Sequence, residues 1–170
     1  MNDFDPEKIV AALQLEPHPE GGYFRENYRS QESISQASLP ARFSGSRSFS
    51  TAIYYLLVGE QFSTLHRIKQ DEVWHFYLGS TLKIHEINST GQYREIKLGQ
   101  DWENGETMQA IVAQNSWFAA ELGEKNKNNF ALVGCTVAPG FDFEDFEIGN
   151  RQELLDRYPE YKEIIQKMTK

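Results

Sequence analysis

Short runs rich in β-branched and aromatic residues fill the middle of the chain, and glycine- or asparagine-containing turns separate them. Runs of this length and composition are typical of β-strands. No helical pattern interrupts the series, so the chain is predicted to form an antiparallel sandwich or barrel. The eight predicted strands are Thr51–Val58, Ser63–Ile68, Val73–Leu78, Thr81–Ile87, Tyr93–Leu98, Met108–Val112, Ser116–Leu122 and Phe130–Val137.

Helical spacing is confined to the two ends of the chain. Asp5 is a candidate N-cap, and the apolar stripe after it predicts a short amphipathic helix that ends at Leu15. Asn150 resembles the start of a capping box, and Pro159 separates the helix that follows from a second helical segment. Residues 30–50, rich in Ser and Gln, predict a long loop of the kind that forms lids or binding loops.

Composition places the chain among ordinary globular proteins. Its 170 residues are 39% hydrophobic and 25% charged, which is enough to bury a core, and we expect one domain over residues 1–170. The net charge of −8 argues against nucleic acid and anionic membranes as partners. No run approaches the roughly 20 apolar residues of a membrane helix, and the first ten residues lack a signal-peptide pattern. A cytoplasmic location is expected.

The stretch Gly59–Gly79 carries the most informative polar residues. Strand alternation puts His66 on one face of its strand, and a turn delivers Glu72 at the head of the next strand. Trp74 and Phe76 share the face of Glu72. If both faces look inward, His66 and Glu72 meet in an aromatic-lined cavity, which is the usual composition of a small-molecule site.

The same stretch resembles the first conserved motif of the cupin superfamily, in which a glycine precedes His-x-His, a glutamate and a second glycine. His66 takes the first histidine position and Glu72 takes the glutamate position. Ile68 stands at the second histidine position. Phe118 stands where the second cupin motif has its last metal ligand.

Longer runs resemble one subgroup, the cupin-5 family of largely uncharacterised proteins. The resemblance implies an all-β cupin double-stranded β-helix, or jelly-roll barrel, with short N-terminal and C-terminal helices. It also implies a fold similar to that of bacterial dTDP-sugar epimerases, and commonly a homodimer. The runs that carry it are Pro19–Glu26, Tyr54–Leu57, His66-Arg67 with Asp71–Tyr77, and Cys135–Phe146.

Two roles remain open for His66 and Glu72. They are two of the four usual metal ligands, so a divalent metal would need further ligands from water or substrate. Alternatively His66 is a general base, because a histidine titrates near neutral pH. By analogy with the epimerases, the orienting carboxylate would be Asp142 or Asp145, and the acid would be Tyr54 or Tyr55. The plain alternative is a hydrogen-bonded core histidine.

Aromatic residues supply the candidate walls of the pocket. Trp74, Phe76, Trp117 and Phe118 together would suit a flat ring, although each alone is an ordinary core residue. Arg25 is a candidate for binding a phosphate or a carboxylate, with a surface salt bridge as the alternative. An outward stripe of Val73, His75 and Tyr77 predicts a surface that a second subunit covers. Asp142–Glu147 is predicted to be a solvated edge.

These observations define three hypotheses. The first is a small-molecule-binding cupin that acts as an isomerase or epimerase on a sugar or nucleotide-sugar-like metabolite, with His66 and Glu72 as catalytic residues. The second is a non-catalytic module that binds or senses a metabolite. The third is a metal-dependent enzyme with a reduced ligand set.

Overall fold

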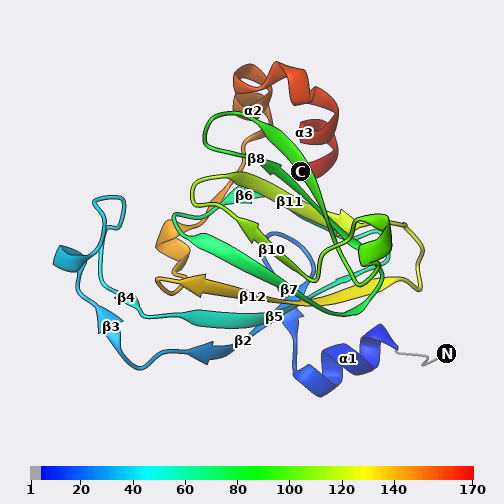
Figure 1. Ribbon diagram of the computed structural model, residues 1–170, viewed down its shortest axis with the longest axis horizontal. Coiled ribbons are helices and arrows are strands. Elements are labelled where there is room, and N and C mark those ends of the chain that lie inside the picture. The colour runs from blue at the N-terminus through cyan, green and yellow to red at the C-terminus, as the bar shows by residue number, and fades with distance from the viewer. Residues whose placement is uncertain (1–4) are drawn as a thin grey trace.

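Two antiparallel sheets face each other in the computed structural model, which describes residues 5–170 (Figure 1). All eight strands predicted from the sequence form, with small shifts at their ends. The first sheet runs β1 (Glu16–Pro17), β2 (Tyr23–Arg29), β5 (Thr51–Val58), β12 (Phe130–Ala138), β7 (Asp71–Gly79) and β10 (Gln109–Val112). The second runs β13 (Glu147–Ile148), β6 (Phe62–Arg67), β11 (Trp117–Leu122), β8 (Leu82–Ile87) and β9 (Tyr93–Leu98).

The main core lies between the two sheets. Leu57 and Val133 contribute from the first sheet, and Ile84 and Phe118 from the second. All four are at most 1% exposed. Full burial of such a side chain stabilises a fold by about 1.5–3 kcal/mol, so this layer holds the sheets together.

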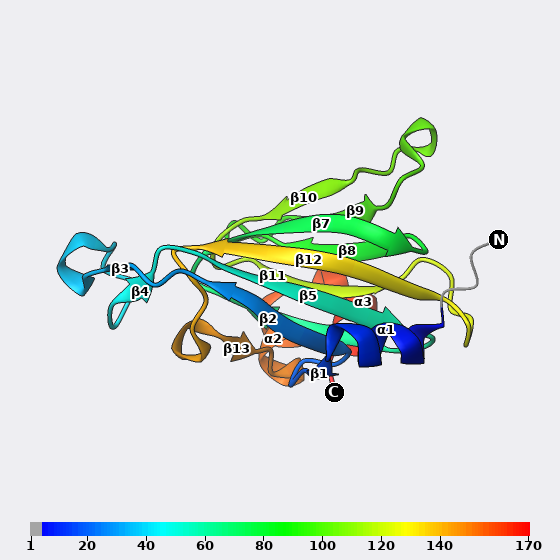
Figure 2. The ribbon, with the colours of Figure 1, turned by 90° about the horizontal axis from the view of Figure 1, so that it is seen from below.

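Helices cover the outer face of each sheet (Figures 1 and 2). Helix α1 (Pro6–Leu13) packs through Ile9 on Leu56 and Phe130 of the first sheet, and the Asp5 carboxylate caps it. Helices α2 (Arg151–Arg157) and α3 (Lys162–Met168) pack on the second sheet. The Asn150 side chain accepts from the backbone N–H of Glu153, as the capping pattern predicts. The one-turn helix η4 (Pro159–Tyr161) joins them.

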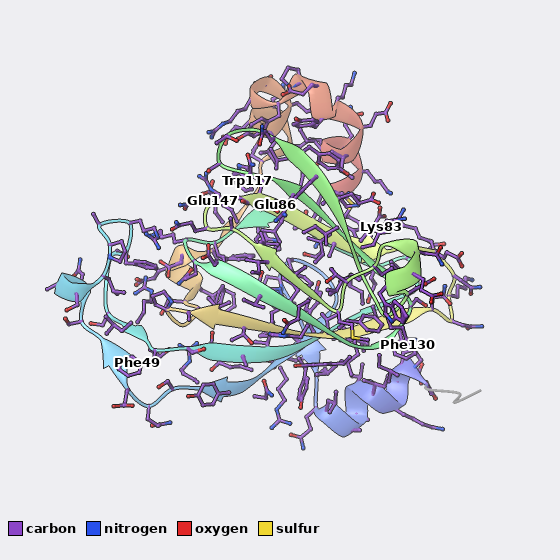
Figure 3. The ribbon with its side chains drawn as sticks, viewed as in Figure 1. Phe49, Lys83, Glu86, Trp117, Phe130 and Glu147 are labelled. Carbon is purple, nitrogen blue, oxygen red and sulfur yellow. The ribbon has the colours of Figure 1, made fainter. Side chains whose placement is uncertain are left out.

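Residues 30–50 form an arm that projects beyond the sheets (Figure 2). The predicted loop contains a short strand pair, β3 (Ser33–Ile34) and β4 (Arg47–Ser48), and the one-turn helix η1 (Gln36–Ser38). Phe49 ends this segment, at the far end of the first sheet from Phe130 (Figure 3). The arm therefore lies at one end of the sandwich, opposite α1.

No helix within residues 5–170 is long and apolar enough to cross a membrane. The residues before Asp5, on which part of the signal-peptide expectation rests, lie outside the described range. Two further one-turn helices complete the described elements: η2 (Trp102–Asn104), and η3 (Phe143–Asp145), which borders the cavity described next.

Candidate functional site

A cavity of about 200 Å³ opens between the sheets. Its walls come from β2, β5, β6, β7 and β12, from the turn before β2, and from the segment around η3. Apolar and aromatic side chains make most of the wall, with a smaller set of acids, histidines and one arginine. The aromatic residues are Phe24, Tyr55, Trp74, Phe141, Phe143 and Phe146; the charged or titratable ones include His18, Glu20, Glu26, Arg29, His66 and Glu72.

His66 points from β6 into this cavity and is 3% exposed. Its Nδ1 lies 2.8 Å from the carbonyl oxygen of Thr64, and because a carbonyl only accepts, Nδ1 carries a proton. Its Nε2 lies 3.0 Å from a carboxylate oxygen of Glu20. Burial opposes the charged ring, but the Glu20 charge and the hydrogen bonds raise the pKa of His66 above its ordinary value. Because both nitrogens face acceptors, His66 has the hydrogen-bonding pattern of an imidazolium that donates from both.

Glu20 is the carboxylate partner of His66, and it lies in the run Pro19–Glu26, which the sequence marks only through the family resemblance. Gly21 and Gly22 have positive φ values of 119° and 72°. A Cβ on Gly21 would stand 2.2 Å from the Phe62 carbonyl oxygen, so only glycine lets this turn lie against β6. Burial raises the pKa of the Glu20 carboxyl, but the charge and hydrogen bond of His66 outweigh it and leave that pKa below its usual value.

Glu72 is the second buried carboxyl of the cavity, at the head of β7 as the sequence predicts. One of its oxygens accepts from the indole N–H of Trp74 at 3.1 Å. Burial among apolar side chains raises the pKa of Glu72 to about 7, although the nearby His66 charge lowers it. The adjacent Cys135 is buried, which raises the pKa of its thiol, so it stays protonated. Glu72 therefore exchanges its proton near neutral pH.

His18 borders the same carboxylate from the other side. Its Nδ1 accepts from the backbone N–H of Glu20 at 3.3 Å and lies 3.7 Å from a Glu20 carboxylate oxygen. Burial lowers the pKa of His18, which keeps the ring neutral, although the Glu20 charge acts in the opposite direction. The ring packs edge-on against Phe24 with centroids 4.5 Å apart and stacks on Phe143 at 6.4 Å.

The segment around η3 borders the cavity and is anchored by a buried ion pair. Arg47 of the arm contacts both carboxylate oxygens of Asp145 at 2.7 Å, and both residues are 4% exposed. Gln70 donates to Asp145 at 2.7 Å. The prediction that Asp142–Glu147 is a solvated edge is wrong at Asp145, because this pair holds it inside. Both carboxylate oxygens of Asp145 are paired with Arg47, so Asp145 does not orient His66.

The two tyrosines and the other aspartate proposed for proton transfer also take different positions. Asp142 lies at the mouth of the cavity and caps η3, while Glu20 pairs with His66. Tyr55 lines the cavity, but its hydroxyl donates to the Gly21 carbonyl at 2.7 Å. Tyr54 packs beside Tyr77, with ring centroids 6.1 Å apart, on the outer face of the first sheet. The sequence could not pair these distant residues.

Of the predicted binding residues, Trp74 and Phe118 lie at the site. Trp74 lines the cavity, while Phe118 packs behind His66 with ring centroids 4.0 Å apart. Phe76 shares the face of Trp74 but borders a separate hollow beside Thr81, because each step of two residues along β7 moves further along the barrel.

Trp117 and Arg25 lie away from the cavity. Trp117 faces the C-terminal helices, where Arg67 stacks on it at 4.5 Å and also pairs with Glu147 at 2.6 Å (Figure 3). Arg25 donates to the Leu13 carbonyl at 3.1 Å, at the end of α1. Arg25 therefore fastens the N-terminal helix and does not reach a ligand in the cavity.

The residues present do not fit the divalent metal that the cupin resemblance implies. Within the described part of the chain, no three His, Cys, Asp or Glu side chains converge as a ligand set. Ile68 and Phe118 contribute hydrocarbon where the cupin motifs place ligands, and both nitrogens of His66 are occupied.

His75 lies on the outer face of the first sheet. Its Nε2 is 3.1 Å from the Thr136 hydroxyl, and its Nδ1 is 3.0 Å from the Gln109 amide nitrogen. Tyr77 on the same strand is 52% exposed. A homodimer that uses this face stays a prediction.

Proteins of known sequence or structure are similar to this chain over most of its length. The uncharacterized protein YML079W of Saccharomyces cerevisiae is 32% identical over 146 residues, which cover 82% of this chain and 72% of that protein. Protein SO0799 from Shewanella oneidensis is 34% identical, with a TM-score of 0.87 and 98% of each chain covered. A hypothetical protein from Leishmania major is 31% identical, with a TM-score of 0.86 and 98% and 99% covered.

A more distant likeness shows the fold alone. Oxalate decarboxylase from Bacillus subtilis is 14% identical, with a TM-score of 0.54, and the match covers 89% of this chain and 36% of that one. The family described as Cupin superfamily (DUF985), Cupin_5, matches residues 7–149, which is most of the chain. The jelly-roll sheets and the cavity between them are thus those of a small-molecule-binding cupin, and this chain belongs to the Cupin_5 family.

Proposed function

We propose that the chain is an enzyme that moves a proton on a small ring-bearing metabolite, in the manner of an isomerase or epimerase, and that Glu72 gives and takes this proton. One observation carries the proposal: a buried carboxyl whose pKa is raised to about 7 borders an aromatic cavity. A general acid–base group works best when its pKa lies near the working pH. Carboxyls with such a shift cluster at functional sites.

His66 has a different role in this proposal from the general base that the sequence suggested. Its two nitrogens already donate to Thr64 and Glu20, so the ring has no free lone pair for a substrate proton. The ion pair instead places a fixed positive ring beside Glu72, whose pKa it lowers toward neutrality. His66 is thus a positioning residue, and Glu72 is the proposed catalytic residue.

The chemical step uses only these groups and the substrate. The ionised carboxylate of Glu72 removes a proton from a carbon next to a carbonyl, and the C–H electrons move to the carbonyl oxygen to form an enolate. Return of the proton to the opposite face of the same carbon, after the enolate turns over in the cavity, gives the epimer. In an α-hydroxy carbonyl substrate, return of the proton to the former carbonyl carbon, with the hydroxyl proton passing to the enolate oxygen, gives the isomer. No oxidant or reductant is needed.

The size of the cavity limits the substrate. Its volume of about 200 Å³ is below the roughly 300–1,000 Å³ of pockets for drug-sized ligands. A single sugar-like or heterocyclic ring fits this space, whereas a linked nucleotide would have to remain outside. We therefore place the reacting group on one ring.

Deuterium uptake tests the proposal without knowledge of the substrate. The chain is incubated with a cell extract of small metabolites in D₂O, and mass spectrometry follows each compound. We expect at least one ring metabolite to gain deuterium with the unchanged chain, and Glu72→Gln to slow this by about 100-fold or more, because general acid–base catalysis contributes about 10²–10⁴-fold.

Glu121→Gln is the matched control, because Glu121 is also a buried glutamate of the sheet structure but faces the C-terminal helices. The ring metabolite should gain deuterium as fast with Glu121→Gln as with the unchanged chain. The second candidate, a non-catalytic binding module, is favoured by the full engagement of His66. It replaces the first if the chain retains a metabolite and no compound gains deuterium.

A further inference from the structure

The cavity holds no uncompensated positive charge among its described lining residues. The arginine in the described lining is Arg29. Its Nε and Nη2 donate to the two carboxylate oxygens of Glu26 at 2.8 Å and 2.7 Å. Nη2 also donates to the Phe141 carbonyl at 3.0 Å. A bidentate pair of this kind leaves the guanidinium fork filled, so it is not open to a phosphate or carboxylate.

The two histidines do not supply a free cation either. The charge of His66 is offset by Glu20 at 3.0 Å. His18 is kept neutral, because burial lowers its pKa. Two further carboxyl groups, those of Glu72 and Asp142, border the same space. Neither forms a salt bridge with a positively charged residue of the described cavity lining. An anion that entered would meet more negative than positive charge at low dielectric, where repulsion is strong.

Acceptors also outnumber unused donors in the cavity, where the Nε2–H of neutral His18 is the donor that the contacts below leave open. The indole N–H of Trp74 donates to Glu72, and the hydroxyl of Tyr55 donates to Gly21. Both N–H groups of His66 are used in the same way. An ionised carboxylate, by contrast, has about four acceptor positions, and a protonated carboxyl keeps acceptor positions beside its O–H donor. The contacts of Glu72 and Asp142 fill only part of these positions. A ligand that donates hydrogen bonds complements this surface.

The remaining wall is aromatic. Phe24, Phe141, Phe143 and Phe146 surround the His18 end, with neighbouring centroids 4.5–6.4 Å from the His18 ring or from one another. Ring faces and edges at these spacings offer stacking to a flat or ring-shaped guest.

We infer that the cavity selects a small ring compound that carries hydroxyl or N–H donors and no negative charge. This deepens the proposed function, on which it rests, and it removes phosphorylated and nucleotide-linked sugars from the substrate class. The geometry that carries it is the bidentate Glu26–Arg29 pair together with the buried Glu20–His66 pair.

Three probes that share one ring and differ in charge test this class: benzyl alcohol, benzylammonium and benzoate. Each is titrated to about 10 mM at neutral pH, and the ¹⁵N resonance of the Trp74 indole, assigned with Trp74→Phe, reports binding. We expect the alcohol and the ammonium ion to bind with millimolar affinity and benzoate to bind at least about ten-fold more weakly. Benzoate that binds as tightly as the alcohol overturns the inference. The inference is also overturned if none of the three probes shifts the ¹⁵N resonance of the Trp74 indole.

A paired variant sharpens the outcome. Glu26→Gln frees the guanidinium of Arg29 and should strengthen benzoate binding by about ten-fold, or about 1.4 kcal/mol. Glu103→Gln removes an equal charge from exposed η2 and should change nothing. Equal effects of the two variants would reject a local role for the pair.

These binding results are independent of deuterium uptake. Loss of charge selectivity with continued uptake rejects the ligand class alone, whereas selective binding without uptake rejects the catalytic proposal alone.

Discussion

Two buried histidine–glutamate pairs lie on opposite faces of the second sheet. His66 meets Glu20 at 3.0 Å on the face that looks into the cavity. His85 meets Glu121 at 3.1 Å on the face that α3 covers. His66 and His85 are 3% and 4% exposed, so the pairs are nearly equal in contact and in burial.

Their surroundings differ in what else touches the carboxylate. Lys167 and Lys125 both reach Glu121, and the Tyr93 hydroxyl occupies the other nitrogen of His85. Around Glu20 there are instead aromatic rings and a cavity, with Glu72 as a second carboxyl nearby. A histidine–glutamate pair is therefore no functional signal by itself. What distinguishes the inner pair is a cavity and a neighbouring carboxyl that keeps its proton to about pH 7.

The largest expected difference is in folding stability. Glu20→Ala removes the partner of a buried imidazolium and should lower the free energy of unfolding by about 3 kcal/mol. Glu121→Ala should cost less, about 2 kcal/mol, because its two lysines are 49% and 40% exposed and can turn to water, while buried His85 loses one hydrogen bond. Urea unfolding near pH 6 measures both. A larger loss for Glu121→Ala would contradict the comparison.

The pH dependence of stability should separate the two sites next. The pKa of Glu72 is raised from 4.5 to about 7. Because the folded chain holds this proton more tightly, the stabilisation from Glu72 is complete below about pH 4.5 and is lost as the pH rises through about 7. At about 1.36 kcal/mol per pKa unit, a shift of about 2.5 units amounts to about 3 kcal/mol. Glu72→Gln should flatten the curve of unfolding free energy between about pH 4.5 and pH 8.

Glu121 should show the opposite sign. Burial raises the pKa of Glu121, but the hydrogen bonds from His85 and Lys167 outweigh this effect and lower the pKa from 4.5 to about 2. Its stabilisation is therefore complete above about pH 4.5 and disappears as the pH falls through about 2. Glu121→Gln should flatten only this acidic part of the curve. If both variants flatten the same range, the two carboxyls are not in opposite environments.

The smallest expected change in stability comes from Lys167, which joins α3 to the second sheet through its ion pair with Glu121. Lys167→Ala should lower the free energy of unfolding by about 0.5–1 kcal/mol, the range of partly exposed ion pairs. The response of the Trp74 indole to benzyl alcohol should stay unchanged, because Lys167 contacts the opposite face of the sheet. A change in that response would show that the outer pair is coupled to the cavity.

The sequence predicts strands well here because their composition and turns are local signals. It also places His66 and Glu72 correctly, since side-chain alternation needs only the two strands and the turn between them. Alternation gives the face of a strand on which a side chain lies but not its position along the barrel. Sequence reasoning therefore groups Phe76 with Trp74, although the two border different hollows. In β11 every residue is buried, because the helices cover its outer face. Nothing local therefore distinguishes Trp117 from Phe118.

The partner of His66 was beyond local reasoning. Glu20 reaches it because Gly21 and Gly22 allow a turn to press against β5 and β6, a contact set by tertiary packing. The only local signal was a carboxylate directly before two glycines. Arg25 misleads for the same reason, since its guanidinium is directed at α1 by the strand register.

The full engagement of the His66 ring has a spectroscopic consequence. Its two N–H protons are held by a carbonyl and a carboxylate in a site that is 3% exposed, so exchange with bulk water should be slow. Both should appear as sharp, strongly downfield proton resonances. A guest that presses on the Glu20–His66 contact would move one of them and leave the other in place, and the ring thereby serves as a built-in, label-free gauge of where in the cavity the guest sits.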